Sequence, residues 1–158
     1  MRRIIAAICL LLCVSQFTAC GSAAEPQLPE QSDNPEETSL EETSMKLFIG
    51  ETEVPVTWEK NESVTALQKL AGGDGLTVSM SMYGGFEQVG SIGQSLPRSD
   101  RQTKTSSGDI VLYSGDQIVI FYGSNSWAYT RLGHVDLAQD KMRELLGNGD
   151  VTIRVLEG

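Results

Sequence analysis

An alternation of apolar and polar side chains with a period of two residues is the feature that most restricts the fold of this chain. It is clearest over residues 76–82, where Leu, Val and two Met residues alternate with Thr and two Ser residues. Successive side chains of a strand point to opposite faces of a sheet, so the pattern predicts a strand buried on one face only. The folded part of the chain is therefore expected to be mainly β.

Five further segments are expected to be strands because they alternate or are rich in β-branched and aromatic residues. They are residues 45–49, 54–58, 109–113, 117–122 and 151–155. Hairpin connections are expected at residues 50–53 and 114–116. Pro55 has no amide hydrogen to donate, which predicts that its strand lies at a sheet edge or contains a bulge.

Residues 84–108 are expected to be the least regular part of the domain. They contain glycines at positions 84, 85, 90 and 93, followed by a polar run of Ser, Thr, Lys and Arg. Long irregular loops in compact domains often carry function, but a mobile connection without a role of its own fits the same composition.

Two short helices are predicted. Asn61 can cap a helix over residues 62–71, which has apolar residues at helical spacing and ends before two glycines. A second helix, ended by Gly147, is indicated by an apolar stripe of Ala138, Met142, Leu145 and Leu146. Many short strands with two small helices predict a small closed β-barrel with two capping helices, and a β-sandwich is the alternative.

The N-terminus has the features of a targeting signal. Two arginines precede an apolar run over residues 4–14, which is too short to span a membrane as a helix. Phe17-Thr18-Ala19-Cys20 resembles a bacterial lipobox, although such a motif usually has Leu at the position of Phe17. The resemblance implies that residues 1–19 are a lipoprotein signal peptide and that Cys20 carries the lipid. The alternative is an ordinary secretory signal cut after Ala19 or Ala24.

Residues 20–44 are expected to form a lipidated cysteine followed by an acidic, disordered tether. The segment after Cys20 has seven acidic residues, no basic residue and three prolines, and it cannot bury enough apolar surface to fold. Residues 45–158 would then be the folded domain, held at the extracytoplasmic face of the bacterial cell membrane. A specific acidic recognition tail is the other interpretation of the segment.

The chemistry that the domain could carry is limited. The net charge of −9 argues against nucleic acid as a partner. The chain has no phosphate-binding loop, nucleophile elbow or dinucleotide fingerprint, and neither a cofactor nor a metal is predicted. His134 and Asp136 would share a face of an extended segment, where an unidentified Ser could complete a triad, but His134 is expected to be a surface or barrel-rim residue. Asp109 and Asp116 flank a hairpin and are expected to serve turn chemistry rather than acid–base catalysis.

Aromatic residues near Asn, Ser and Arg are the most suggestive local feature. Rings supply contact area, while amides and a guanidinium supply direction, so the set fits a groove for an extended peptide or a small ligand. The alternative is that these residues pack in the core or cap the barrel. The candidate ligand-binding residues are Tyr83, Phe86, Tyr122, Asn125, Trp127, Tyr129 and Arg131.

Four ordered blocks carry a family resemblance. They span residues 83–87, 107–113, 117–123 and 127–133, and the segment 149–153 fits as well. In these blocks the chain resembles the bacterial cyclophilin-like fold protein family. The resemblance implies a barrel of about eight strands with two capping helices, but it implies little about function, because the family's biochemical role is largely uncharacterised.

True cyclophilins isomerise prolyl peptide bonds with an Arg in a Phe-His-Arg type block beside a proline pocket. No such block occurs here, and neither Arg98 nor Arg131 matches it. No catalytic residue is carried over. The main hypothesis is a lipid-anchored binding module whose partners are the membrane, through the lipid, and an unknown peptide or small molecule. The alternatives are a prolyl isomerase and a structural envelope protein.

Overall fold

The computed structural model describes residues 44–158 of the protein. The predicted signal peptide, the lipidation site Cys20 and the predicted tether up to residue 43 lie outside the described residues. Those interpretations therefore stay predictions of the sequence.

The described part of the chain has ten strands and two helices. In chain order they are β1 (Met45–Ile49), β2 (Thr52–Val54), β3 (Val56–Trp58), α1 (Glu62–Ala71), β4 (Leu76–Tyr83), β5 (Glu87–Ser91), β6 (Arg101–Lys104), β7 (Asp109–Tyr113), β8 (Gln117–Phe121), β9 (Ser126–Val135), α2 (Gln139–Leu146) and β10 (Val151–Glu157). The fold is mainly β, as the alternation predicted.

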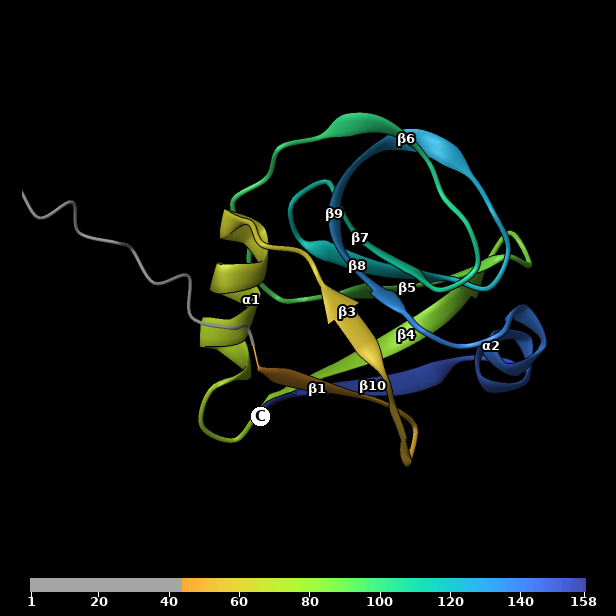
Figure 1. Ribbon diagram of the computed structural model, residues 1–158, viewed down its shortest axis with the longest axis horizontal. Helices are drawn as coiled ribbons and strands as arrows, with labels where there is room; N and C mark the ends of the chain where they lie inside the picture. Colours follow the sequence, from red (N-terminus) through yellow and green to blue (C-terminus); the bar gives the residue numbers. More distant parts are fainter. Residues whose placement is uncertain (1–43) are drawn as a thin grey trace, which may run out of the picture. The chain divides into compact units, whose positions relative to one another are not determined.

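The strands form one antiparallel sheet that curls into a nearly closed barrel (Figure 1). Its order is β2-β1-β10-β4-β5-β8-β7-β9-β3, and β6 pairs with β9 outside this path. The strands at the two ends of the order, β2 and β3, are separated in the chain by Pro55 alone. The barrel prediction is thus confirmed over the β-sandwich, because the chain itself joins the two edges of the sheet.

Pro55 divides the strand that was expected over residues 54–58. β2 pairs with β1, whereas β3 pairs with β9, so the chain changes partners at the proline. Proline has no amide hydrogen for either ladder, but its carbonyl accepts a hydrogen bond from the Asp136 amide at 2.9 Å. The residue therefore marks the seam of the barrel.

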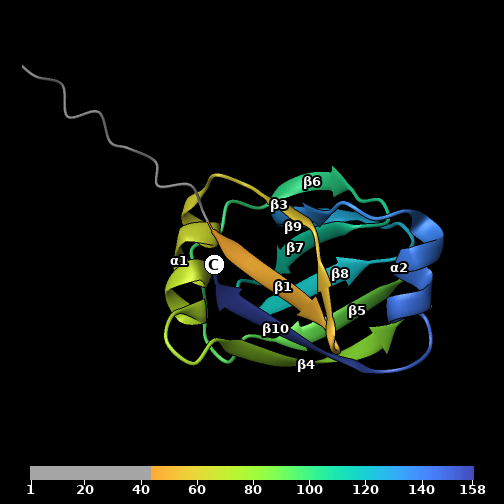
Figure 2. The ribbon, with the colours of Figure 1, turned by 60° about the horizontal axis from the view of Figure 1, so that its bottom comes forward.

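The two helices lie at opposite ends of the barrel (Figure 2). The Asn61 side chain accepts a hydrogen bond from the Val64 amide at 3.0 Å, so the predicted cap of α1 is confirmed. Val64 of α1 and Met142 of α2 are buried and belong to the main core cluster. Each helix thus buries one apolar face against the barrel interior, as the sequence predicted.

The expectation that residues 84–108 are irregular is wrong in part, because β5 and β6 lie within them. Gly90 indicated a loop, yet it lies inside β5. A Cβ atom at Gly90 would lie 2.5 Å from Met80 Sδ and 2.7 Å from the Ser79 carbonyl. Glycine is required there because β4 approaches closely, and not because the chain turns.

Candidate ligand-binding site

One wall of the barrel is apolar on both faces. Ile118 and Ile120 of β8 point into the main core, whereas Val119 and Phe121 belong to a second buried cluster with Val111 and Tyr129. A strand that is buried on both faces has a continuous apolar run instead of alternation. The second cluster forms the floor of a pocket on the opposite face of the wall from the main core.

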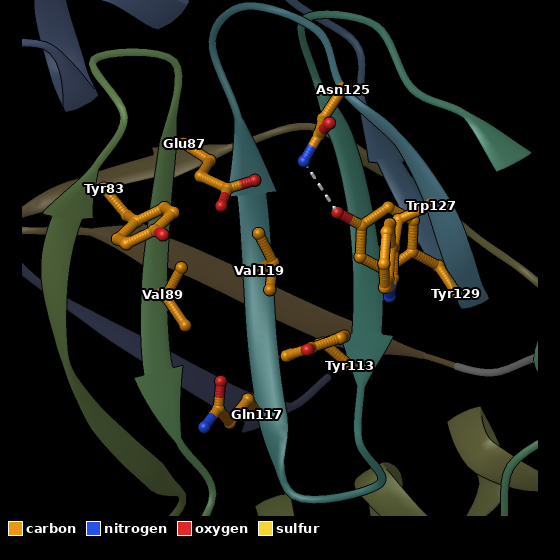
Figure 3. Close-up of a pocket in the computed structure, with 9 residues that line it drawn as sticks. All are labelled: Tyr83, Glu87, Val89, Tyr113, Gln117, Val119, Asn125, Trp127 and Tyr129. Carbon is orange, nitrogen blue, oxygen red and sulfur yellow. Dashed lines mark hydrogen bonds between the residues drawn. The ribbon is translucent and has the colours of Figure 1, made fainter.

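This aromatic pocket has a cavity volume of about 260 Å³. Figure 3 shows side chains from β4, β5, β7, β8 and β9 that converge on it. Nine described residues line it, namely Tyr83, Glu87, Val89, Tyr113, Gln117, Val119, Asn125, Trp127 and Tyr129. Its walls are therefore mostly rings and β-branched residues, with one carboxyl and two amide side chains.

Glu87 is the charged group of the pocket. Only 6% of the residue is exposed, and its Oε2 atom has no hydrogen-bond partner among the described residues. Burial raises the pKa of the Glu87 carboxyl above 4.5, and the Asn125 side chain offsets part of that rise. The carboxyl group is thus held in a desolvated position beside the neutral Asn125 side chain, and its Oε2 atom lacks a described partner.

Asn125 and Tyr129 form the opposite side of the pocket. The Asn125 amide nitrogen donates to the Tyr129 hydroxyl at 3.1 Å, which is the hydrogen bond drawn in Figure 3. The Asn125 side-chain oxygen accepts from the Ser126 amide at 2.7 Å. The Tyr129 ring packs edge-on against Phe121 and Tyr113. These contacts leave both side chains little freedom to rotate, so this wall is preorganised.

Arg131 belongs to a separate polar network beside the wall. Its guanidinium donates to Oδ1 of the buried Asp109 at 2.8 Å and lies 3.5 Å from Glu59. The Ser106 amide donates to the other Asp109 oxygen at 2.8 Å. Burial alone would raise the pKa of Asp109, but the contacts with His134, Ser106 and Arg131 outweigh it and lower the pKa below 3.8.

The pairing of His134 with Asp136 that a triad would need is not formed. His134 Nδ1 lies 3.0 Å from Asp109 Oδ1, whereas Asp136 accepts a hydrogen bond from the Thr57 hydroxyl. β7 and β9 are adjacent, and Asp109 is the direct cross-strand neighbour of His134. His134 therefore contacts Asp109 of the adjacent strand, and not the Asp136 that lies two residues further along its own chain. Asp109 was expected to serve turn chemistry, and it does bind the nearby Ser106 amide. It also contacts Arg131 and His134 of β9.

A charged groove lies beyond Tyr129, which lines it as well as the aromatic pocket. Its charged lining residues are Glu59, Lys60, Glu62, Arg98, Arg101 and Arg131. Arg98 and Arg131 already have acidic partners within the groove or next to it. Two of its three arginines thus have acidic partners, whereas the aromatic pocket has no basic residue among its described lining.

Residues 47–155 match the sequence pattern of the Cyclophilin-like family. The chain belongs to that family. The match covers every strand of the sheet in whole or in part, together with both helices. The resemblance identified from the four sequence blocks is thereby confirmed, and so is the barrel that it implied.

This cyclophilin-like chain also resembles one solved structure, "Structure of McbB in complex with tryptophan". The TM-score is 0.53 with 14% sequence identity, and the likeness covers 72% of this chain and 44% of the McbB chain. The chain thus spans less than half of McbB, and the likeness concerns the fold. No curated protein matches the chain.

The cyclophilin-like barrel brings four of the seven predicted site residues together. Tyr83, Asn125, Trp127 and Tyr129 line the aromatic pocket. Phe86 packs against the second cluster beneath the turn, and Tyr122 points into the main core. Arg131 lies in the charged groove with Asp109. Adjacent strand residues alternate between faces, so a continuous aromatic segment cannot supply one pocket in full.

The other five lining residues were not predicted as site residues. They are Glu87, Val89, Tyr113, Gln117 and Val119. Glu87, Tyr113 and Gln117 stand in the blocks that carry the family resemblance, which was a usable signal. The pairing of β5 with β8 then decides that Glu87 lies opposite Phe121, on the same face as the second cluster.

None of the helices in residues 44–158 has the length and apolar character needed to cross a membrane. No set of three or more His, Cys, Asp or Glu side chains in this range is arranged to hold a metal ion.

Proposed function

We propose that the protein is a lipid-anchored extracytoplasmic binding module that holds a small molecule, or one side chain of a peptide, in the aromatic pocket. The observation that carries the proposal is a preorganised cavity of about 260 Å³ that contains a buried carboxyl oxygen without a partner among the described residues. Apolar walls with a few convergent polar groups are typical of ligand sites. A shared fold with a tryptophan-bound protein is in line with this role.

Binding can be tested through the two tryptophans of the chain. Trp127 lines the pocket and is 57% exposed, so a bound ligand will change its fluorescence. A library of metabolites and short peptides is screened against the full chain in a non-ionic detergent. Because the substitution removes the fluorophore, the variants are compared by calorimetry. Trp127→Ala is expected to remove the binding that is found, and Phe48→Ala, an aromatic substitution outside the pocket, is expected to keep it. Ligands that bind both variants equally would place the site elsewhere.

The anchor rests on the sequence Phe17-Thr18-Ala19-Cys20. In a bacterial host fed an alkyne-labelled fatty acid, the chain is expected to acquire the label and to sediment with membranes. Cys20→Ser should lose the label. Unlabelled, secreted wild-type protein would support an ordinary signal peptide instead.

The isomerase alternative is suggested by the family of the chain. True cyclophilins use an arginine beside the proline pocket, but no arginine is among the nine described residues that line this pocket. A protease-coupled assay on a proline peptide distinguishes it from the binding module. Relaxation on the uncatalysed timescale, tens to hundreds of seconds, is expected. A structural envelope protein would instead give a stable protein crosslink and no small ligand.

A further inference from the structure

The Glu87 carboxyl group is unusual because it is buried without a counter-ion among the described residues. None of the seven ion pairs formed by residues 44–158 includes it. No Lys, Arg or His occurs among the nine described residues that line its pocket. Buried carboxylates in proteins are normally paired, because an unpaired charge in a desolvated site is strongly unfavourable.

The polar groups around Glu87 do not fill this role. The Asn125 side chain lowers the pKa of Glu87 through a hydrogen bond, but it is neutral and therefore no counter-ion. Its nitrogen also donates to the Tyr129 hydroxyl, and its oxygen accepts from the Ser126 amide. Tyr129 itself carries a raised pKa, first because of burial and then because of the Glu87 charge. The carboxyl thus adds negative potential to the pocket, and Oε2 stays without a donor from the described residues.

The rings beside the carboxyl complete the recognition chemistry. Tyr83 is 67% exposed and Trp127 is 57% exposed, although both are large and largely apolar. Tyr113 and Tyr129 add two further rings, and Tyr129 is buried. Exposed apolar side chains around a concave site indicate a binding surface, and aromatic faces attract cations through their quadrupoles.

We propose that the aromatic pocket selects an organic cation, namely a primary or secondary ammonium joined to an apolar or aromatic group. The ammonium would donate N–H hydrogen bonds to Glu87, while its apolar part lies between the rings of Tyr83, Trp127 and Tyr129. A cation would favour the ionised carboxylate and compensate its charge, whereas a neutral donor would only hydrogen-bond to it. The inference deepens the proposed function, on which it rests, by naming the class of ligand.

Three small probes of nearly equal shape test the inference. 2-Phenylethylamine is a cation at neutral pH, 2-phenylethanol is neutral, and phenylacetate is an anion. Each is titrated against the full chain in a non-ionic detergent, with Trp fluorescence and calorimetry as readouts. The amine is expected to bind at least about tenfold more tightly than the alcohol, as for a charge-assisted hydrogen bond in a desolvated site. The anion is expected to bind more weakly than either.

Glu87→Gln is the decisive variant because it keeps the shape of the side chain and removes its charge. It is expected to abolish the preference for the amine over the alcohol. Because burial disfavours the ionised carboxyl, the variant should unfold at a temperature equal to or above that of the wild type at neutral pH. Glu51→Gln, at a side chain that is 98% exposed, is the matched control and should keep the preference.

A second variant, Tyr83→Ala, keeps the inference testable if Glu87→Gln does not fold. Tyr83 is mostly exposed, so its substitution should leave the fold intact. It should weaken binding of the amine several-fold more than binding of the alcohol. Equal affinity of the wild type for amine and alcohol, with Trp127-dependent binding of both, would overturn the cation inference and leave the binding module standing. An amine preference that survives Glu87→Gln would also overturn the inference. If no probe and no library compound shows Trp127-dependent binding, both proposals fail.

Discussion

Two buried acidic residues of this barrel behave in opposite ways. Asp109 and Glu87 are 3% and 6% exposed, so desolvation acts on both. Asp109 accepts hydrogen bonds from Arg131 and Ser106 and has a lowered pKa, whereas one oxygen of Glu87 has no described partner and its pKa is raised. Hydrogen bonding to the charged form, and not burial, decides the sign. Asp109 therefore stabilises the fold, and Glu87 is available for a ligand.

Asp109→Asn is expected to destabilise the protein at neutral pH by about 1–3 kcal/mol, because it weakens the hydrogen bonds that a charged acceptor makes. The pKa of Asp109 is lower in the folded state than 3.8. Its stabilising effect is therefore fully present above that pH and is lost as the pH falls through the lowered pKa. Urea unfolding from pH 7 to pH 2.5 should show the difference between variant and wild type shrinking below about pH 3.8.

Asp136→Asn serves as the control for this measurement. Asp136 is exposed and accepts a hydrogen bond from the Thr57 hydroxyl at 2.8 Å. Its effect on the unfolding free energy is expected to stay within about 0.5 kcal/mol, as for most surface substitutions. A constant destabilisation of Asp109→Asn down to pH 2.5 would show that the charge of Asp109 is not what stabilises the fold.

At the scale of elements, β5 connects the site with the end of a helix. Glu87 faces the pocket, while the next residue, Gln88, is fully buried on the opposite face. The Gln88 side chain donates to the carbonyls of Leu146 and Gly149, each at 2.7 Å. The last carbonyls of a helix have no partner within the helix, so Gln88 supplies the cap for the C-terminus of α2. β5 thus holds α2 over its end of the barrel.

Gln88→Leu keeps the volume of this side chain but removes its donors. It leaves two carbonyls without their hydrogen bonds, and the unfolding free energy is expected to fall by about 1–3 kcal/mol. Amide hydrogen exchange should accelerate first in α2. Gln139→Leu, at an exposed position of the same helix, should change little. Undiminished protection of α2 in Gln88→Leu would contradict the proposed cap.

At the scale of the whole molecule, the barrel depends on a short seam. β3 contributes three residues to the pairing with β9, among them Trp58 opposite Gly133. A Cβ atom at Gly133 would lie 2.8 Å from the Thr57 carbonyl and 3.2 Å from the Trp58 ring. The two strands can thus approach closely only where β9 has no side chain. This close approach keeps β3 paired with β9, so that the sheet ends on the strand that Pro55 connects to β2.

Gly133→Ala should therefore weaken closure of the barrel and lower the unfolding free energy by about 1–3 kcal/mol, as overpacking does. Exchange of the β3 and β9 amides should rise together. Gly72→Ala is the control, because a Cβ atom there makes ordinary contacts, the nearest at 3.4 Å. Equal melting temperatures of Gly133→Ala and Gly72→Ala would show that the seam tolerates a side chain.

The sequence predicted most elements, because period and capping are local properties. The alternation over residues 76–82, the Asn61 cap and the loop at residues 114–116 all have their counterparts in the structure. The prediction that residues 84–108 are irregular was wrong at Gly90, because a glycine is needed there to let the neighbouring strand β4 approach. The candidate site was found in part, through the aromatic residues of β4 and β9 that line the pocket.

By itself, the sequence determined that the domain is a mainly β, cyclophilin-like barrel with helices at its ends. Apolar patterning, helix caps and the blocks that carry the family resemblance are all local features of the sequence. Only the tertiary structure decided that Asp109 and not Asp136 faces His134, that Tyr122 points into the core, and that one Glu87 oxygen lies among rings without a described partner. The physical reason is that the register between strands distant in sequence decides which side chains come into contact and which are buried away from water.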